Sequence, residues 1–155
     1  MKPLPEALER LVSTLESLER EDRIAVLIET AGQFTPLPER IARRPFPAAH
    51  RVPGCESEAY IWSEARPDGT LSFYFAVENP QGISAMSLAV ILRDSLSGAP
   101  LDEVAEVPAD VVYRIFGREL SMGKSLGLMG IVNMVRSAAR QQMHPAETKN
   151  SACGD

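Results

Sequence analysis

Cys55 is the side chain in this sequence whose neighbours most favour chemistry. It follows the corner Pro53-Gly54 directly and precedes a strand-like run that begins at residue 57. Pro53 restricts its own φ angle, and Gly54 can adopt backbone angles that are closed to other residues. These neighbours place Cys55 on an exposed, sharply turned loop, and loops mounted on rigid elements often carry reactive groups. The residues leave one alternative open, a small buried side chain, which is the usual fate of a free cysteine.

Two histidines are the other candidates for cysteine chemistry. His50 lies five residues before Cys55 and would serve as its base if the Pro-Gly corner brought the two together, but an ordinary surface histidine is the favoured interpretation. His144 has no evident role. The cysteines and histidines do not have the spacing of a zinc or iron site, so neither a metal nor another cofactor is expected.

Lys124 lies in Gly123-Lys124-Ser125, a run similar to the end of a phosphate-binding P-loop. That motif requires a glycine at position 118, where this chain has Arg118, and a strand before the loop, which the sequence does not predict. Nucleotide binding is therefore rejected.

Composition narrows the class of protein. The 16 lysines and arginines are outnumbered by 21 aspartates and glutamates, and the net charge of −5 argues against a general nucleic-acid-binding protein. Two cysteines do not make a disulfide framework, and no apolar run is long enough for a membrane span or a signal peptide. We expect one domain over residues 1–144, a disordered tail over residues 145–155, and a cytoplasmic protein with reduced thiols and no membrane contact.

Helical periodicity predicts two helices near the N-terminus. Apolar residues recur on one face from residue 4 to residue 18, in a helix that starts near Pro5. Asp22 is expected to cap a second helix, which Gly32 ends. The predicted inner face of that second helix is Ile24, Leu27, Ile28 and Ala31.

A connector with five prolines runs from residue 33 to residue 53 and is expected to be extended, with a short helical turn at residues 38–42. The arginines at positions 40, 43 and 44 are interpreted as solvated charges in preference to a docking site for an acidic partner. Apolar alternation over residues 57–65 and 70–77, around the turn Pro67-Asp68-Gly69, predicts an antiparallel hairpin.

The rest of the chain is predicted to be helical. A buried helix starts at Asn79-Pro80 and runs to residue 96, and two short helices cover residues 101–106 and 108–116, the second ended by Gly117. A long amphipathic helix follows over residues 122–142. This order predicts an α+β fold in which a small antiparallel β-sheet packs against several helices.

Residues 50–60 resemble the active-site segment of the SufE family of sulfur-acceptor proteins, whose pattern is approximately Asn-x-Val-x-Gly-Cys-x-Ser-x-Val-Trp. His50 stands where the family usually has asparagine, and Ala59-Tyr60 replaces Val-Trp. The matching residues are Val52, Gly54, Cys55 and Ser57.

A second stretch is similar to the start of the last helix of SufE proteins, where the pattern is Ser-Pro-x-Arg-Ser-x-Gly-Leu. Lys124 replaces the family arginine, and a lysine offers a point charge in place of a planar fork. The matching residues are Ser121, Ser125, Gly127 and Leu128. The resemblance covers residues 5–142 and implies a SufE/IscU-like fold.

The resemblance implies a role in sulfur transfer. In the SufE family the cysteine takes a sulfane sulfur from a pyridoxal-phosphate cysteine desulfurase (SufS-like), stimulates that enzyme, and passes the sulfur to an iron–sulfur scaffold complex (SufBCD-like). Cys55 would carry the persulfide and would react as a thiolate, so the protein would be a carrier and not itself an enzyme. The loop residues Val52, Gly54 and Ser57 would support it.

Other interpretations of these residues remain. Lys124 and His50 are candidates for contact with the thiolate or with the partner protein. At position 124 the alternative is an ordinary solvated lysine. An iron–sulfur scaffold would need more cysteine ligands than this chain has. A cysteine-nucleophile hydrolase using either histidine would lack an orienting motif. In a structural adaptor the Gly-Cys-x-Ser loop would be incidental. Cys153, in the tail, is predicted to be dispensable.

Overall fold

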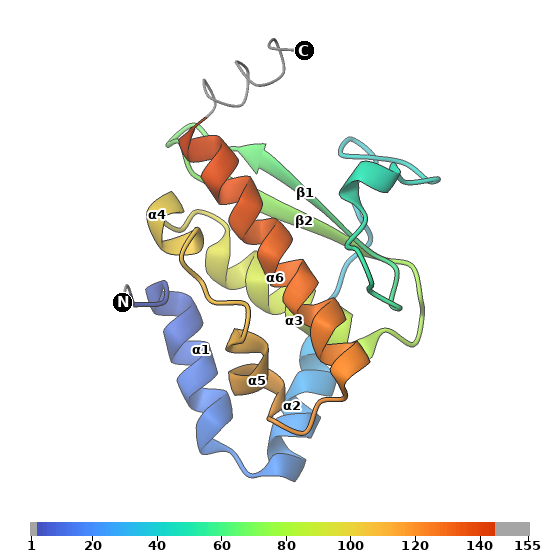
Figure 1. Cartoon of the computed structure of the whole chain (residues 1–155), viewed down its shortest axis with the longest axis vertical. Helices are drawn as coiled ribbons and strands as arrows, with labels where there is room; N and C mark the ends of the chain where they lie inside the picture. The colour runs from blue at the N-terminus through green and yellow to red at the C-terminus, as the bar shows by residue number, and fades with distance from the viewer. Residues whose placement is uncertain (1–2, 145–155) are drawn as a thin grey trace.

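A two-stranded antiparallel sheet, the predicted hairpin, forms one side of the molecule in the computed structural model, which describes residues 3–144 (Figure 1). Strand β1 spans Ala59–Ala65 and strand β2 spans Leu71–Val77. In their register Ile61 lies opposite Phe75. One face of the hairpin is packed into the core, as alternating strands require. Its buried residues are Ala59, Ile61, Leu71, Phe73 and Phe75.

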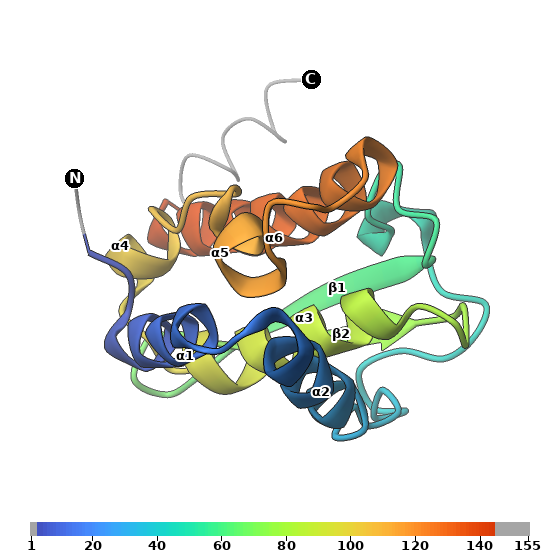
Figure 2. The ribbon, with the colours of Figure 1, turned by 90° about the horizontal axis from the view of Figure 1, so that it is seen from below.

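Helices cover that inner face, which confirms the α+β fold. Within residues 3–144 the helices are α1 (Glu6–Ser17), α2 (Arg20–Ala31), α3 (Ile83–Leu96), α4 (Leu101–Val104), α5 (Val111–Phe116) and α6 (Met122–Met143). Figure 2 shows α3 and the hairpin lying between α6 on one side and α1 with α2 on the other. Helix α3 is therefore the centre of the core, and its Leu88 and Leu92 are fully buried.

The start of α3 differs from the prediction that Asn79-Pro80 begins the helix. The chain first makes a turn, in which the Asn79 side-chain oxygen accepts from the N–H of Gln81 at 2.9 Å and its carbonyl accepts from the N–H of Gly82 at 2.9 Å. Asparagine side chains favour such turns because they substitute for a backbone acceptor. The helix begins three residues later, at Ile83.

Helix α2 also departs from the prediction, both at its start and in its orientation. It begins at Arg20 because the carbonyl of Glu19 already accepts from the N–H of Arg23 at 2.9 Å, so Asp22 lies inside the first turn and is not the cap. Gly32 ends the helix as predicted. Of the four residues predicted to face the core, two are buried and two are exposed. Leu27 and Ala31 are each 7% exposed, whereas Ile24 is 44% and Ile28 is 57% exposed.

The connector between α2 and β1 is mostly extended, as predicted, and packs along the hairpin. The expected helical turn at residues 38–42 is reduced to one hydrogen bond, from the N–H of Ile41 to the carbonyl of Pro38 at 2.9 Å. A short 3-10 helix occupies Ala48–His50. The connector arginines at positions 40, 43 and 44 are exposed. Two of them also form ion pairs along the hairpin, Arg40 with Glu64 at 2.7 Å and Arg44 with Glu78 at 2.8 Å.

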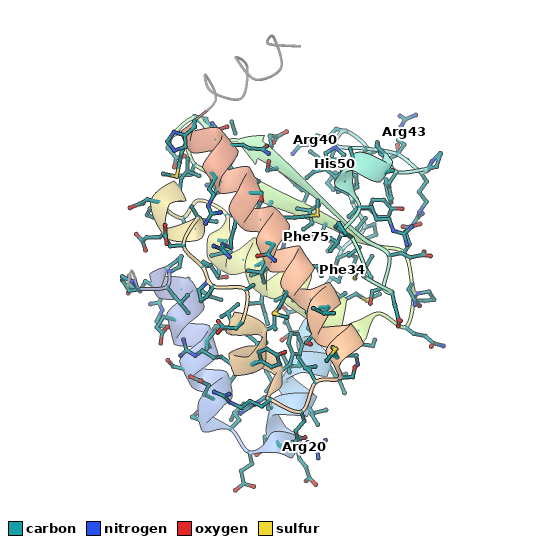
Figure 3. All side chains as sticks on the ribbon, viewed as in Figure 1. Arg20, Phe34, Arg40, Arg43, His50 and Phe75 are labelled. Atoms are coloured by element: carbon teal, nitrogen blue, oxygen red, sulfur yellow. The ribbon has the colours of Figure 1, made fainter. Side chains whose placement is uncertain are left out.

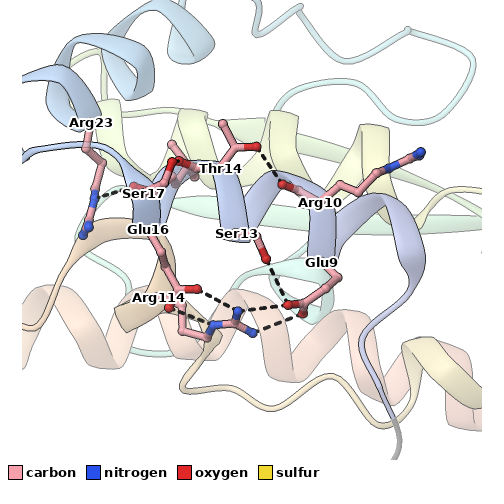
Figure 4. Close-up of polar contacts among 9 residues, drawn as sticks. Glu9, Arg10, Ser13, Thr14, Glu16, Ser17, Arg23 and Arg114 are labelled. Atoms are coloured by element: carbon pink, nitrogen blue, oxygen red, sulfur yellow. Dashed lines mark hydrogen bonds and ion pairs between the residues drawn. The ribbon is translucent and has the colours of Figure 1, made fainter.

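An ionic clamp joins α1 to α5 on the far side of the molecule (Figure 4). The guanidinium of Arg114 donates to Glu9 at 3.1 Å and to Glu16 at 2.8 Å. Helix α5 starts at Val111, three residues after the predicted start, and ends at Gly117, whose φ is +95°. Helices α4 and α6 lie within two residues of their predicted bounds.

No helix within residues 3–144 combines the length and the apolar character that a membrane crossing needs. The predictions made for residues 145–155, including those for Cys153, fall outside the described residues.

Candidate functional site

Cys55 is buried, with only 5% of its surface exposed, although its neighbours Gly54 and Glu56 are exposed. The expected sharp turn is present, and of the two positions that the sequence left open for the cysteine the structure shows the buried one. The thiol belongs to the hydrophobic core cluster and has no hydrogen-bond partner among the described residues. The turn points it inward because α6 packs across the loop.

The turn around Cys55 uses two residues with left-handed backbone angles. Gly54 has a φ of +69°, and Glu58 has a φ of +54°. The N–H of Glu58 donates to the carbonyl of Cys55 at 3.1 Å, which closes the turn. Glu58 also explains why β1 begins at Ala59 and not at the predicted residue 57, since its positive φ interrupts the extended chain. A non-glycine residue at such an angle marks a locally strained segment.

Asn79, two residues after β2, holds this turn at the open end of the hairpin, where β1 begins. Its N–H donates to the carbonyl of Ser57 at 3.1 Å, and its side-chain amide donates to the carbonyl of Glu56 at 3.4 Å. The N–H of Glu78 adds a bond to the carbonyl of Glu58 at 3.1 Å. Sequence reasoning missed this role because Asn-Pro is also a typical helix start. The turn is thus fixed by residues about 20 positions further along the chain.

Helix α6 presents glycines to the loop. A Cβ added to Gly127 would lie 3.3 Å from the Cα of Cys55 and 3.5 Å from its sulfur. A Cβ added to Gly130 would lie 2.9 Å from a methyl carbon of Val52, which is fully buried. The missing side chains let the helix backbone approach the loop closely. Gly127 belongs to the matched SufE pattern, whereas no feature of the sequence alone pointed to Gly130.

A cavity of about 250 Å³ opens beside the cysteine between the loop, the start of α3 and the start of α6. It brings Cys55, Ser57 and Lys124 together, while Val52 lies behind the loop in the core and Gly54 at its corner. Lys124 is exposed and comes from the first turn of α6, where its N–H donates to the Ser121 hydroxyl at 3.3 Å. The remaining lining residues are Glu56, Gln81, Gly82, Ile83, Ser84, Gly123, Gly127 and Leu128.

His50 does not line this cavity. Its Nδ1 lies 2.8 Å from the carbonyl oxygen of Ile61, and its ring stacks on Trp62 with the ring centres 5.0 Å apart. A carbonyl only accepts, so Nδ1 carries the hydrogen. Figure 3 shows His50 on the connector beside the hairpin, in the same region as Arg40 and Arg43. The histidine therefore anchors the connector to β1 and is not brought to the cysteine.

Metal ligands do not gather at this site. Across residues 3–144 no group of three or more histidine, cysteine, aspartate or glutamate side chains is arranged to hold a metal ion.

Comparison with known proteins gives a family match over most of the chain. Residues 9–139 match the family model of SufE, described as an Fe-S metabolism associated domain. Two uncharacterized SufE-like proteins, from the CDC 1551 and H37Rv strains of Mycobacterium tuberculosis, are 24% identical to this chain over 137 residues, covering 88% of this chain and 90% of theirs.

A solved structure has the same fold. The solution structure of a hypothetical protein from Thermus thermophilus superposes with a TM-score of 0.70 at 23% identity, covering 91% of this chain and 98% of that chain. At this identity the likeness concerns the fold alone.

Proposed function

The chain belongs to the SufE family, whose domain is associated with iron–sulfur metabolism, and from that premise we propose that it is a sulfur acceptor carrying a persulfide on Cys55. In this proposal the sulfur comes from a SufS-like pyridoxal-phosphate cysteine desulfurase, which the acceptor stimulates, and goes on to a SufBCD-like iron–sulfur scaffold. The protein acts in the cytoplasm as a carrier and not as an enzyme.

The transfer step needs one nucleophile and no external oxidant or reductant. The thiolate of Cys55 attacks the terminal sulfur of the donor's Cys-S-SH. A new S–S bond forms at Cys55 while the S–S bond of the donor breaks, and its electron pair leaves on the donor sulfur as a thiolate. The proton of the sulfane sulfur stays with that atom or is lost to solvent. Delivery to the next acceptor repeats the exchange in the opposite sense.

The observation that carries the proposal is the position of the Cys55 thiol, on a tightly fixed turn at the wall of a cavity of about 250 Å³. One water molecule takes roughly 30 Å³ in the liquid, so the cavity has room for an added sulfur atom. A persulfide held there is protected from reductants between docking events. Reaction with a protein donor then requires the loop to move outward, away from α6.

Lys124 gives the cavity a cation on its rim. The N-terminal turn of a helix already favours anions through the backbone dipole, so a lysine there adds little to helix stability and slightly opposes the dipole. We assign it the role of attracting the thiolate or persulfide anion, or a carboxylate of the partner, when the loop opens. As a single point charge it tolerates several geometries, unlike the planar arginine fork of the family pattern.

Intact-mass analysis tests the proposal directly. Incubation with L-cysteine and a SufS-like desulfurase should add the mass of one sulfur atom to the protein, and peptide mapping should place it on Cys55. Cys55→Ser should abolish both the mass gain and the stimulation of the desulfurase, and Cys153→Ser should change neither. Stimulation that survives Cys55→Ser but not Cys153→Ser would mean that the wrong thiol has been chosen.

A further inference from the structure

Helix α2 leaves two isoleucines exposed on one face, and they line a groove of about 630 Å³. Ile24 is 44% and Ile28 is 57% exposed, and Ile83, at the start of α3, is 43% exposed on the same groove. Figure 2 shows the start of α3 lying between α2 and the N-terminal part of α6. Clustered exposed apolar side chains of this kind mark interaction surfaces more often than single exposed ones do.

The rim of the groove has the opposite charge to the molecule as a whole. Four cations line it, Arg20, Arg23, Arg118 and Lys124, against one anion, Glu119. The rim therefore carries a net charge of +3, whereas the chain carries −5. Glu119 is paired with Arg20 at 3.0 Å, so it does not neutralise the remaining cations. The partner that fits such a surface presents apolar side chains flanked by carboxylates.

The groove is continuous with the cavity beside Cys55. Ile83, Ser84 and Lys124 line both of them. A protein segment seated against Ile24 and Ile28 thus ends at the mouth of the cavity that holds the thiol. This arrangement points to the sulfur donor as the occupant, because the donor's reactive cysteine has to reach Cys55 while the two proteins are in contact.

We propose that the groove bounded by α2, the start of α3 and residues 116–124 is the docking site for an acidic, apolar surface segment of the desulfurase that supplies the sulfur. The proposal rests on the function proposed above and extends it to α2, which lies outside both stretches of the chain that match the family pattern. Binding to the apolar floor provides affinity, and the basic rim orients the donor and speeds its approach.

The experiment measures binding and sulfur transfer separately, with a SufS-like desulfurase from the same organism as the probe. Ile28→Glu removes an apolar contact and puts a negative charge next to the carboxylates of the donor. Arg118→Glu replaces one positive charge on the rim with a negative one. Val26→Glu is the matched control, since Val26 is 36% exposed on the same helix but does not line the groove. The first two variants should raise the Kd for the desulfurase about tenfold or more, whereas the control should leave it unchanged. The effect of Arg118→Glu should diminish at high salt.

Two readouts check that the variants keep an intact site. In a Cys153→Ser background, the unfolding midpoint and the rate of Cys55 alkylation by iodoacetamide should match those of the parent protein. Altered alkylation in Ile28→Glu would mean that the groove acts on the cysteine loop, which overturns the docking proposal. Unchanged Kd values in Ile28→Glu and Arg118→Glu would also overturn it.

The docking proposal and the sulfur-acceptor proposal fail in different ways. If the desulfurase binds and the groove variants weaken binding, but no sulfur appears on Cys55, docking stands and the acceptor function falls. If sulfur reaches Cys55 at the same rate in all variants, docking falls and the acceptor function stands. Self-association of the parent protein that Ile28→Glu abolishes, with desulfurase binding intact, would make a second copy of this chain the occupant and would overturn the proposal.

Discussion

Gly54 is held at a φ of +69°, in the left-handed region where a side chain is costly. No heavy atom lies within 4 Å of the position that its Cβ would take, so a substitution acts through the backbone and not through a clash. Gly69, in the hairpin turn, shares both properties, with a φ of +87° and open space around it. Substitutions at the two glycines should therefore cause similar backbone strain, and only the one at Gly54 should change the shape of the cysteine turn.

Gly54→Val and Gly69→Val should each lower the free energy of unfolding by about 1–2 kcal/mol or more, because a left-handed angle is unfavourable for a β-branched residue. Only Gly54→Val should also slow sulfur acceptance, since it forces a different turn directly before Cys55. Urea unfolding and the rate of persulfide formation measure the two effects. Equal acceptance rates in both variants would show that the geometry of this turn does not matter to the chemistry.

Lys124 lies on the wall shared by the Cys55 cavity and the groove, so its charge should affect transfer with little effect on stability. Lys124→Ala should slow sulfur transfer, Lys124→Arg should preserve it, and Lys124→Glu should be the slowest. Because the side chain is exposed, high salt should reduce these differences. Transfer kinetics at low and high ionic strength check the order, and identical rates in all four proteins would identify Lys124 as an ordinary surface lysine.

The glycines of α6 are the feature that lets this helix close over the cysteine loop. A glycine within a helix normally costs roughly 0.5–1 kcal/mol relative to alanine. At Gly123 a Cβ would meet no atom within 4 Å, whereas at Gly127 it would meet the backbone of Cys55 at 3.3 Å. The cost of Gly127 to the helix is therefore offset by the close packing that it permits.

Gly123→Ala should raise the free energy of unfolding by up to about 1 kcal/mol, because it removes backbone entropy from the unfolded chain without a clash. Gly127→Ala should give no such gain, and it should increase the rate of Cys55 alkylation by pushing the loop away from α6. Urea unfolding and iodoacetamide kinetics in a Cys153→Ser background provide the measurements. An equal gain in stability from both substitutions would contradict the close-packing argument.

The clamp between α1 and α5 should make stability depend on pH. Hydrogen bonds from Arg114 lower the pKa of Glu9 and of Glu16 below their ordinary values, with burial opposing the shift. A carboxyl whose pKa is lower in the folded state stabilises the fold above its unfolded pKa, and that contribution is lost as the pH falls through the folded pKa. The clamp should therefore be fully effective at neutral pH and lost under acid conditions.

Arg114→Met, which keeps the apolar stem, should lower the free energy of unfolding at pH 7 by about 1 kcal/mol or less, since all three side chains are more than a third exposed and solvent screens them. The difference from the parent protein should shrink as the pH falls below about 4. Thermal unfolding across this range is the test. Arg10→Met, at an exposed pair with Glu6 3.7 Å apart, is the control and should have a smaller effect. A loss of stability that does not change with pH would mean that Arg114 stabilises the fold through packing and not through its charge.

Across the whole molecule, the Cys55 turn is a junction between parts that are distant in sequence. The hairpin continues from it, Asn79 before α3 holds its carbonyls, and α6 covers its sulfur. Val52 and Cys55 are buried in the core, whereas the turn that follows them is held by hydrogen bonds to Glu78 and Asn79. Segments of this kind open at a lower free energy than the core does.

Alkylation of Cys55 in a Cys153→Ser background should therefore proceed by local opening. The rate should be far below that of the unfolded chain and nearly insensitive to low urea concentrations. Asn79→Ala should accelerate it by removing the side-chain bonds to Glu56 and Gln81, with a smaller effect on the unfolding midpoint. A rate that follows the global unfolding constant as urea increases would mean that the thiol is reached only when the whole molecule unfolds.

Much of the fold and the position of Cys55 on a turn follow from local patterns in the sequence. Alternation around Pro67-Asp68-Gly69 predicts the hairpin, and a segment that is apolar on nearly all sides predicts the central position of α3, since both depend on periodicity over a few neighbouring residues. The Pro-Gly corner likewise predicts the turn before Cys55. Element boundaries are predicted less well, because asparagine at position 79 suits both a turn and a helix cap, and aspartate at position 22 suits both a helix cap and the first turn of a helix.

Packing between distant segments decides the features that local patterns do not encode. Periodicity predicts that one side of α2 is apolar, but the rotation of the helix against α3 buries Leu27 and exposes Ile28. The burial of Cys55 depends on α6, far along the chain, and on the absence of a side chain at Gly127. The meeting of Lys124 with Cys55 at one cavity has the same origin. Each of these contacts joins residues far apart in the chain, so its geometry exists only once the helices have packed on the hairpin.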